Sequence, residues 1–131
     1  MTRNVITIST DETIVEVAKL MKKHDIGSVI IVDGQKRAKG IVTERDVIHK
    51  LIAAGKDVAS TKVEAVMSKP LRVITPDTPL EVAAQAMRKN NIKRLPVVNA
   101  QTQLVGIISE GDIMRIFPAI VDLLEERVAL R

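Results

Sequence analysis

The sequence predicts a mixed α/β (α+β) fold in which two copies of one β-α-β-β-α unit pack through their sheets about a pseudo-twofold axis, with an additional C-terminal helix. Two observations carry this prediction. The segment Gly40–Asp46, GIVTERD, returns 66 residues later as Gly106–Asp112, GIISEGD. Apolar residues at helical spacing and short β-branched runs also recur in the same order in both halves. A chain of 131 residues has the size of one compact domain.

The repeat extends across both halves without a gap and divides the chain into four parts. It pairs Ile8 with Ile74, Met21 with Met87, and Val32 with Val98. The parts are a first repeat over residues 1–55, a linker over 56–66, a second repeat over 67–117 and a C-terminal amphipathic helix over 118–131. Because one repeat of about 50 residues buries too little apolar surface to be stable alone, the two are expected to share one core as a single globular module.

Each copy is expected to contain an extended segment, a helix, two strands joined by a tight turn, and a second helix. In the first copy these are Val5–Ser9, a helix with the apolar face Ile14, Val17, Ala18 and Met21, strands Ser28–Val32 and Ala38–Val42 around Asp33–Gly34, and a helix opening at Thr43. In the second copy they are Leu71–Thr75, a helix with the apolar face Leu80, Ala83, Ala84 and Met87, strands Leu95–Val98 and Gln103–Ile108 around Asn99–Ala100, and a helix opening at Ser109. Capping boxes are predicted at Thr13–Glu16 and Thr78–Glu81, with first helices that start one residue apart.

The composition is that of a soluble globular protein and disfavours nucleic acid as a partner. The 20 Lys and Arg residues outnumber the 16 acidic residues, which gives a formal net charge of +4. The basic residues are interleaved with the acidic ones rather than gathered in one run. One Phe and no Trp or Tyr leave no aromatic platform for stacked bases. Without cysteine, disulfides, thiolate catalysis and Cys-ligated metals are excluded. Since neither a signal peptide nor a membrane-spanning apolar run is visible, we expect a cytoplasmic protein without a membrane partner.

The sequence also argues against an enzyme. Its two histidines, His24 and His49, lie near the C-terminal ends of predicted helices, where a cation meets the negative end of the helix dipole. Neither has a partner at the spacing of a zinc site or of a nucleophile and its base. Neither a Gly-rich phosphate loop nor a dinucleotide fingerprint occurs. We therefore expect no catalytic residue, no metal and no required cofactor.

The repeated segment predicts a place for a ligand. Thr43 and Ser109 stand where the second strand ends and the second helix begins, so backbone N–H groups and the positive helix end are expected to face a cleft and to suit phosphate. Three residues later, Asp46 or Asp112 is placed to accept hydrogen bonds from both hydroxyls of a ribose. The same spacing also fits a helix cap, in which the hydroxyl and the carboxylate bond the N–H groups of the helix itself. Gly40 and its copy leave room either for packing or for a ligand.

Taken together, these features resemble the CBS-domain pair, or Bateman module. The resemblance spans essentially the whole chain and rests on Asp11–Met21, Asp77–Met87, Ile92–Val98 and the GIVTERD and GIISEGD segments, in order and duplicated. It implies two CBS repeats joined by a pseudo-twofold axis, often paired again in a flat homodimer. It further implies that adenine nucleotides or related adenosyl ligands bind in clefts between the repeats.

The resemblance also implies two sites, each combining the acid of one repeat with the first strand and pre-strand loop of the other. One would contain Thr43, Arg45, Asp46, Leu71, Arg72, Arg94 and Pro96. The other would contain Ser109, Gly111, Asp112, Val5, Ile6, Ile26, Gly27, Ser28 and Ile30, with Lys93 pointing into it. Arg94 is the candidate for phosphate pairing, because a guanidinium matches phosphate oxygens. The alternative for Arg94 and Lys93 is a charge in a solvated loop. Since Gly111 stands in the place of Arg45, and Ile30 in that of Pro96, unequal affinities are expected.

We therefore expect a regulatory module that senses an adenosine-containing ligand, such as AMP, ATP or an S-adenosyl compound. Signalling requires the ligand to bind one conformational state more tightly than the other. Because no output domain accompanies the repeats here, the signal is expected to pass to an unidentified regulated protein or to another subunit. The alternative is a ligand-free scaffold that dimerises through the C-terminal helix, whose stripe of Ile120, Leu123, Leu124 and Val128 otherwise packs within the chain. Binding of DNA or RNA through basic loops is the least favoured interpretation.

Overall fold

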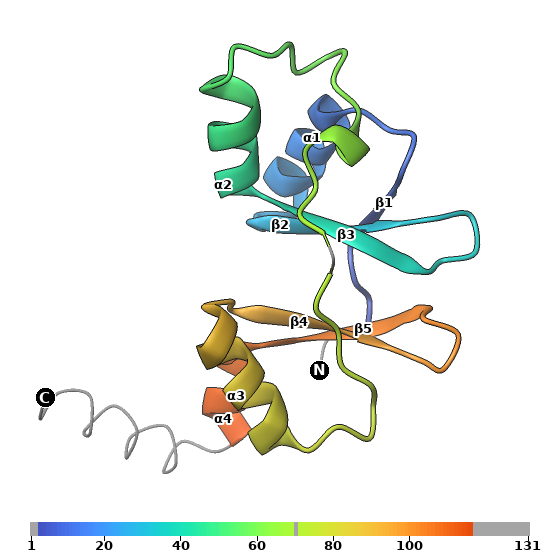
Figure 1. Cartoon of the computed structure of the whole chain (residues 1–131), viewed down its shortest axis with the longest axis vertical. Coiled ribbons are helices and arrows are strands. Elements are labelled where there is room, and N and C mark those ends of the chain that lie inside the picture. The colour runs from blue at the N-terminus through green and yellow to red at the C-terminus, as the bar shows by residue number, and fades with distance from the viewer. Residues whose placement is uncertain (1–2, 70, 117–131) are drawn as a thin grey trace, which may run out of the picture.

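The computed structural model describes residues 3–69 and 71–116, which form two sheets stacked between two layers of helices (Figure 1). The mixed α/β fold and the two packed copies of one unit are confirmed, although one predicted strand is lost. The predicted C-terminal helix over 118–131 lies outside the described residues. Within the described ranges, every helix is too short or too polar to cross a membrane.

The first repeat contains every predicted element. These are β1 (Thr7–Ser9), α1 (Ile14–His24), β2 (Ser28–Val32), β3 (Ala38–Thr43), α2 (Glu44–Asp46) and a π-helical continuation, η1 (Val47–Ile52). Strand β2 lies at the centre of the sheet, parallel to β1 and antiparallel to β3. Its run of β-branched residues suits this place, because such side chains pack well on a pleated surface.

The second repeat lacks the strand predicted at Leu71–Thr75. Its elements are α3 (Leu80–Asn90), β4 (Arg94–Val98), β5 (Leu104–Ser109) and α4 (Glu110–Ile116), and only Ile74 bridges to β4. In the first repeat the pairing of β1 with β2 continues, because Thr10 N–H donates to Val32 O at 3.2 Å. The equivalent of Thr10 is Pro76, which has no N–H to donate, so the ladder stops after Ile74. On the other side of Ile74, Pro96 stands at the position of Ile30 and also lacks an N–H for pairing.

The first helix of each repeat buries most of its predicted face. In α1, Ile14 and Val17 are buried, whereas Ala18 is exposed and Leu20 packs on the core in its place. In α3 the predicted face is confirmed, since its four members all belong to the core or pack against it: Leu80, Ala83, Ala84 and Met87. Helical periodicity therefore located both helices but wrongly assigned Ala18 to the buried face.

The predicted capping boxes of these two helices are wrong. The N-cap residues are Thr13 and Pro79, and neither makes a side-chain bond to its helix. At α1 the linker takes over part of this task, because Ile14 N–H donates to Thr61 O at 2.9 Å. The helices start at Ile14 and Leu80, which are equivalent positions, so the predicted one-residue difference is also wrong.

The structure has two hydrophobic cores, each between the helices and the sheet of one repeat. The single core shared by both repeats, which we expected from the small size of one repeat, is not formed by these two clusters. The first is enclosed by α1, β2, β3 and η1, and it includes the linker residues Val63 and Val66. The second is enclosed by α3, β4, β5 and α4. The linker turn η2 (Val63–Ala65) is tied to the first repeat by a hydrogen bond from Val63 N–H to Glu12 O at 2.9 Å. In the structure Met67 and Ser68 continue this path along β3, and we count them with the linker from here on. The linker therefore packs as part of the first core.

The two sheets face each other across the predicted pseudo-twofold axis. Ile30 and Pro96 occupy equivalent positions and are almost completely buried. Because side chains alternate along a strand, Ile30 lies on the face opposite the core residues Val29 and Ile31, and Pro96 lies on the face opposite the core residues Leu95 and Val97. At the hairpin ends, Ala38 N–H donates to Thr102 O at 3.1 Å and Leu104 N–H donates to Lys36 O at 3.0 Å. Each of these two bonds is the image of the other under the internal repeat.

Candidate functional site

The residues that flank the second helices meet at one end of the sheets. Ser28 opens β2 opposite Thr43, and Arg94 opens β4 opposite Ser109. The two pairs are joined across the axis, because Arg94 Nη1 donates to Ser28 Oγ at 3.2 Å. We call the surroundings of Thr43 and Asp46 the first site, and those of Ser109 and Asp112 the second site. The sequence places Arg94 in the first site and Ser28 in the second. In the structure these two side chains contact each other between the two sites.

The helix-cap interpretation of the repeated segment is confirmed in both copies. Asp46 N–H donates to Thr43 Oγ1 at 3.1 Å, while Thr43 N–H donates to Asp46 Oδ2 at 2.9 Å. The same reciprocal pair joins Ser109 and Asp112, at 3.1 Å and 2.9 Å. Hydroxyl and carboxylate thus satisfy N–H groups at the start of each helix, as in a capping box.

The amides expected to face phosphate are largely occupied by the chain itself. Glu44 N–H donates to Gly27 O at 3.0 Å, and Glu110 N–H donates to Lys93 O at 2.8 Å. The bond does not depend on glycine, because Lys93 accepts it in the second repeat at the position equivalent to Gly27. The pre-strand loop of each repeat therefore bonds the first helical amide of the same repeat, and the expectation of exposed helix-start amides is wrong at these positions.

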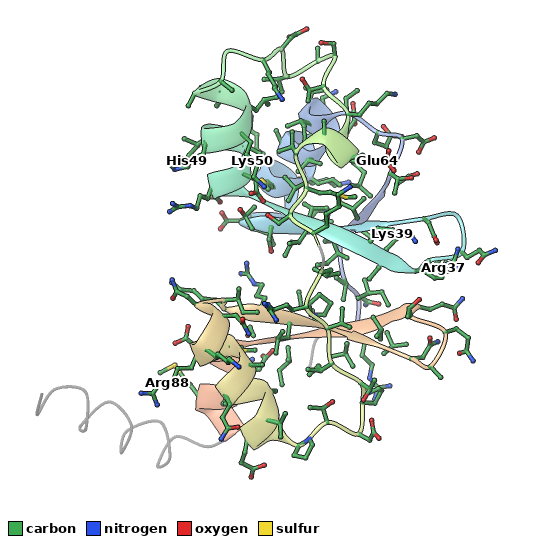
Figure 2. All side chains as sticks on the ribbon, in the orientation of Figure 1. Arg37, Lys39, His49, Lys50, Glu64 and Arg88 are labelled. Atoms are coloured by element: carbon green, nitrogen blue, oxygen red, sulfur yellow. The ribbon has the colours of Figure 1, made fainter. Side chains whose placement is uncertain are left out.

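Asp46 has two further partners that the sequence did not suggest. Ser68 Oγ donates to Asp46 Oδ1 at 3.1 Å and approaches Oδ2 at 3.4 Å, while Lys50 Nζ lies 3.0 Å from Oδ1. Lys50 also donates to Val66 O and to Ser68 Oγ, both at 3.2 Å. In Figure 2, Lys50 points from its helix toward the linker, whereas His49 points outward. The i, i+4 spacing of Asp46 and Lys50 was a usable signal, but Ser68 depends on the path of the linker.

The two carboxylates share low exposure and lowered pKa values. Burial alone would raise the pKa of Asp46, but the bonds from the Thr43 backbone and from Lys50 more than offset it, so its pKa lies below the usual value. Burial likewise opposes the lowering of the pKa of Asp112, which results from its bonds to Ser109 and its ion pair with Arg115. Both side chains are therefore ionised at neutral pH and carry the charge that a ribose or a cation would meet.

The other predicted site residues fall into three groups by exposure. Exposed at the surface are Arg45, Arg72, Lys93, Arg94 and Gly111. Partly buried are Val5, Ile6, Ile26, Gly27, Ser28 and Leu71, and buried between the sheets are Ile30 and Pro96. Ile26 packs against the first core. Gly40 has a packing role, because a Cβ there would lie 2.7 Å from Met67 Sδ and 3.1 Å from Ser68 O.

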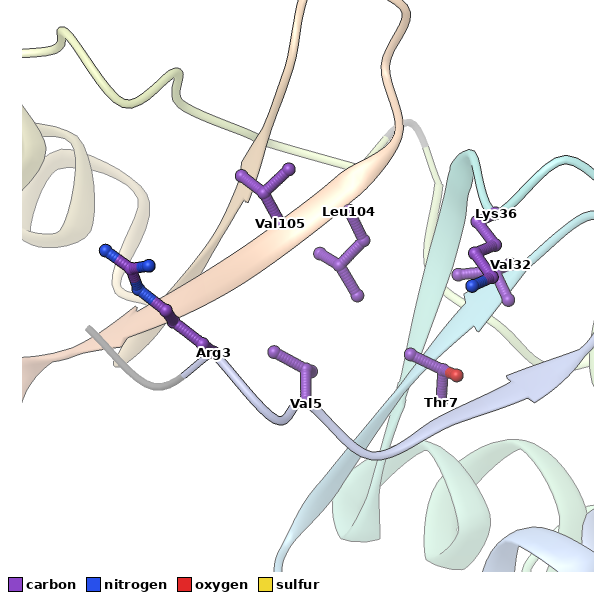
Figure 3. Close-up of a pocket in the computed structure, with 7 residues that line it drawn as sticks. All are labelled: Arg3, Val5, Thr7, Val32, Lys36, Leu104 and Val105. Carbon is purple, nitrogen blue, oxygen red and sulfur yellow. The ribbon is translucent and has the colours of Figure 1, made fainter.

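A pocket lies near the hairpin ends, away from both candidate sites. Its volume is about 310 Å³, and Figure 3 shows it between the N-terminal segment and the start of β5. Its walls are Arg3, Val5, Thr7, Val32, Lys36, Leu104 and Val105. Of the predicted site residues, only Val5 contributes to these walls, so this pocket does not correspond to either predicted site.

Comparison with known proteins identifies the family. The model of the CBS domain matches residues 1–53 and 63–119. This chain belongs to the CBS-domain family. The CBS domain-containing protein YhcV of Bacillus subtilis is 42% identical over 113 residues, which are 86% of this chain and 79% of YhcV. An uncharacterised protein of Methanopyrus kandleri is 37% identical over 126 residues, and the match covers 96% of this chain but only 64% of that protein.

Solved structures of CBS proteins share this fold over most of the chain. The CBS domain pair of protein MJ0100, in complex with 5′-methylthioadenosine and S-adenosyl-L-methionine, is 33% identical with a TM-score of 0.79, over 91% of this chain and 92% of that one. A hexameric CBS-CP12 protein from bloom-forming cyanobacteria is 36% identical with a TM-score of 0.74, over 87% of this chain and 66% of that one. The arrangement of two CBS repeats about a pseudo-twofold axis is thus common to all three.

Proposed function

We propose that this CBS pair is a regulatory module that binds an adenosine-containing ligand between its repeats and passes a conformational change to a partner. The observation that carries the proposal is the meeting of both capped carboxylates and Arg94 at one end of the facing sheets. A similar CBS pair holds 5′-methylthioadenosine and S-adenosyl-L-methionine. This supports the adenosyl class, with AMP and ATP as further candidates.

Each part of such a ligand has a proposed contact. Asp46 and Asp112 are anionic acceptors for ribose hydroxyls, and charge-assisted hydrogen bonds of this kind are strong. For phosphate or another anionic group, the exposed cations near the axis are Arg45, Arg72, Lys93 and Arg94. For adenine, the apolar surfaces are Ile6, Ile26 and Leu71, together with Ile30 and Pro96 between the sheets.

The burial of Ile30 and Pro96 suggests how binding becomes a signal. Both side chains are almost fully covered where the sheets meet. An adenine ring that packs against them has to separate the sheets at this end, while the hairpin bonds hold the other end. Ligand affinity that is higher for the separated state then shifts the population toward it. The receiver is a second subunit or a regulated protein.

The second candidate function is a dimerisation scaffold without a ligand. Large apolar side chains on the second helices are exposed, with Ile48 at 53%, Ile52 at 61% and Met114 at 41%. Solvent exposure of such a set is typical of a contact surface. Dimerisation and ligand sensing are compatible, so the distinguishing property is ligand binding.

A thermal unfolding series with the full chain tests the proposal. AMP, ATP, 5′-methylthioadenosine and S-adenosyl-L-methionine are added at millimolar concentration, with GMP as the control for base identity. A ligand at 100 times its Kd stabilises the native state by about 2.7 kcal/mol, which raises Tm by several degrees. Asp112→Asn is expected to reduce that rise. If no adenosine compound raises Tm above the GMP control, the scaffold function is favoured.

A further inference from the structure

We propose that the first site is occupied by its own chain: the Ser68 hydroxyl takes the place of a ribose hydroxyl on Asp46, Lys50 holds it there, and a ligand has to displace it. This inference rests on the proposed function, since it concerns how the same carboxylate is made available. It identifies Ser68 and Lys50 as the residues that set the affinity of the first site.

The chemistry of Ser68 matches that of the ligand group. Its Oγ lies 3.1 Å from Asp46 Oδ1 and 3.4 Å from Asp46 Oδ2, so a single hydroxyl faces both carboxylate oxygens. A ribose presents the same donors, aliphatic hydroxyls, to the same acceptors. Asp46 already accepts from Thr43 N–H and Ser68 Oγ and pairs with Lys50 Nζ, which leaves few acceptor positions for a second set of donors. Ribose and Ser68 therefore compete for one acceptor.

The linker backbone holds Ser68 in this position. Ser68 N–H donates to Ile41 O at 2.8 Å, and Ile41 N–H donates to Ser68 O at 3.4 Å, which adds one antiparallel bridge to the edge of β3. The missing Cβ of Gly40 makes room for this contact. Just before it, Val63 and Val66 are buried in the first core. The Ser68 backbone is thus anchored on β3, and the residues that precede it are anchored in the first core.

Lys50 completes the arrangement and distinguishes the two repeats. Its Nζ contacts Asp46 Oδ1, Ser68 Oγ and Val66 O at 3.0, 3.2 and 3.2 Å, which ties the carboxylate to the linker. The equivalent position in the second repeat is Ile116, an uncharged residue type. Asp112 is instead paired with Arg115, whose side chain is 76% exposed. The same hold on the linker is therefore not encoded in the second repeat.

Self-occupation lowers the apparent affinity of the first site. When only a fraction of molecules has the carboxylate available, the apparent Kd rises by the inverse of that fraction. The ligand also has to break the hydrogen bonds from Ser68 Oγ to Asp46. Its entry then releases Lys50 from Asp46 and from Val66 O. Binding at the first site then loosens the linker, whereas binding at the second site does not involve these contacts.

The test uses isothermal titration of the full chain with 5′-methylthioadenosine, in an Asp112→Asn background that weakens the second site. Ser68→Ala is expected to bind about tenfold more tightly than its parent, because a hydrogen bond to a charged group contributes roughly 1.5–3 kcal/mol. Ser60→Ala, at an exposed linker position, is the matched control and is expected to leave Kd unchanged. Lys50→Met is also expected to bind 5′-methylthioadenosine more tightly than its parent.

Each outcome decides the inference. Equal or weaker binding by Ser68→Ala overturns it. Titration of the chain with Asp112 intact gives the second readout: Ser68→Ala is expected to tighten one of the two binding events and to leave the other unchanged. No change in either event also overturns the inference. If the unmodified chain binds no adenosine compound at all, the proposed function itself fails. That result is distinct, because it does not depend on Ser68.

Discussion

Asp46 combines three tasks that are usually separate. It accepts hydrogen bonds from the first residue of its capping box, it pairs with Lys50 one helical turn later, and it receives the hydroxyl of Ser68 from the linker. Each contact favours the charged form of the carboxyl. The unfolded chain has none of these contacts, so the ionisation of Asp46 is coupled to folding.

This coupling predicts a dependence of stability on acid. A carboxyl whose folded pKa lies below its unfolded value, about 3.9 for Asp, contributes stability that is fully present above that value. The contribution is lost as the pH falls through the lowered pKa of Asp46. The free energy of unfolding is therefore expected to be flat from neutral pH to about pH 5 and to fall below pH 4. Urea unfolding at several pH values measures it.

Two variants assign the effect to the carboxyl. Asp46→Asn is expected to be less stable at neutral pH and to lose less stability on acidification, since the titrating group is gone. The exposed acid Glu64 provides the control, and Glu64→Gln is expected to follow the unmodified chain. An acid transition that is equally steep in Asp46→Asn would show that other carboxyls dominate it.

At the scale of single residues, the sequence predicted what is local. The three-residue spacing of Thr43 and Asp46, and of Ser109 and Asp112, is sufficient for the reciprocal caps that form. The contact from Ser68 to Asp46 joins residues 22 positions apart, and no periodic pattern marks it. It exists because the linker returns along the edge of β3, which only the folded chain determines.

Among the elements, the linker depends most on a single glycine. Gly40 lies in β3 beneath Met67 and Ser68, and any Cβ would come within 3.1 Å of the Ser68 carbonyl oxygen. The Met67 side chain is flexible and can move, but that carbonyl belongs to the bridge with Ile41. The room left by Gly40 is thus a condition for the linker to pair with the sheet.

Gly40→Ala is therefore expected to destabilise the chain by about 1–3 kcal/mol, the usual cost of forcing extra volume into a packed contact. Gly34→Ala is the matched control, because a Cβ at Gly34 meets no atom within 4 Å. Urea unfolding at neutral pH compares the two variants. Similar stability of both would contradict the packing role of Gly40.

Element prediction succeeded where periodicity is strong and failed where one chemical group decides. The β-branched runs of β2 and β4 and the helical faces of α1 and α3 stand in their predicted places. The segment Leu71–Thr75 has equally suitable side chains, but Pro76 removes the donor that would extend its pairing. The exposure of Ala18 has a different cause: a small apolar side chain at the edge of a helical face gains little free energy from burial.

On the scale of the whole molecule, the apolar residues on the second helices remain uncovered within the described chain. Ile48 and Met114 occupy equivalent positions in the two repeats, and both are exposed, at 53% and 41%. The molecule therefore has two equivalent apolar patches, one on the second helix of each repeat. A second copy of the chain that covers both patches would form the proposed homodimer.

Charged substitutions on this surface test the homodimer. Ile48→Lys combined with Ile52→Lys is expected to shift the chain from dimer to monomer, because a dimer would bury the added charges without partners. Size-exclusion chromatography with light scattering measures the mass. Val73→Lys, at an apolar residue with 41% exposure outside the second helices, is the control and is expected to stay dimeric. A monomeric unmodified chain would contradict the dimer directly.

The paired bonds between the hairpins have a consequence for how the two repeats diverge. Ala38 with Thr102 and Leu104 with Lys36 form a self-complementary contact, the type that joins identical subunits in a symmetric dimer. In a true dimer every substitution appears twice, so the two sites stay alike. Joining both copies in one polypeptide removes that constraint. One copy is then able to keep Arg45 and Lys50 while the other carries Gly111 and Ile116, so that one molecule presents two helix starts of different charge.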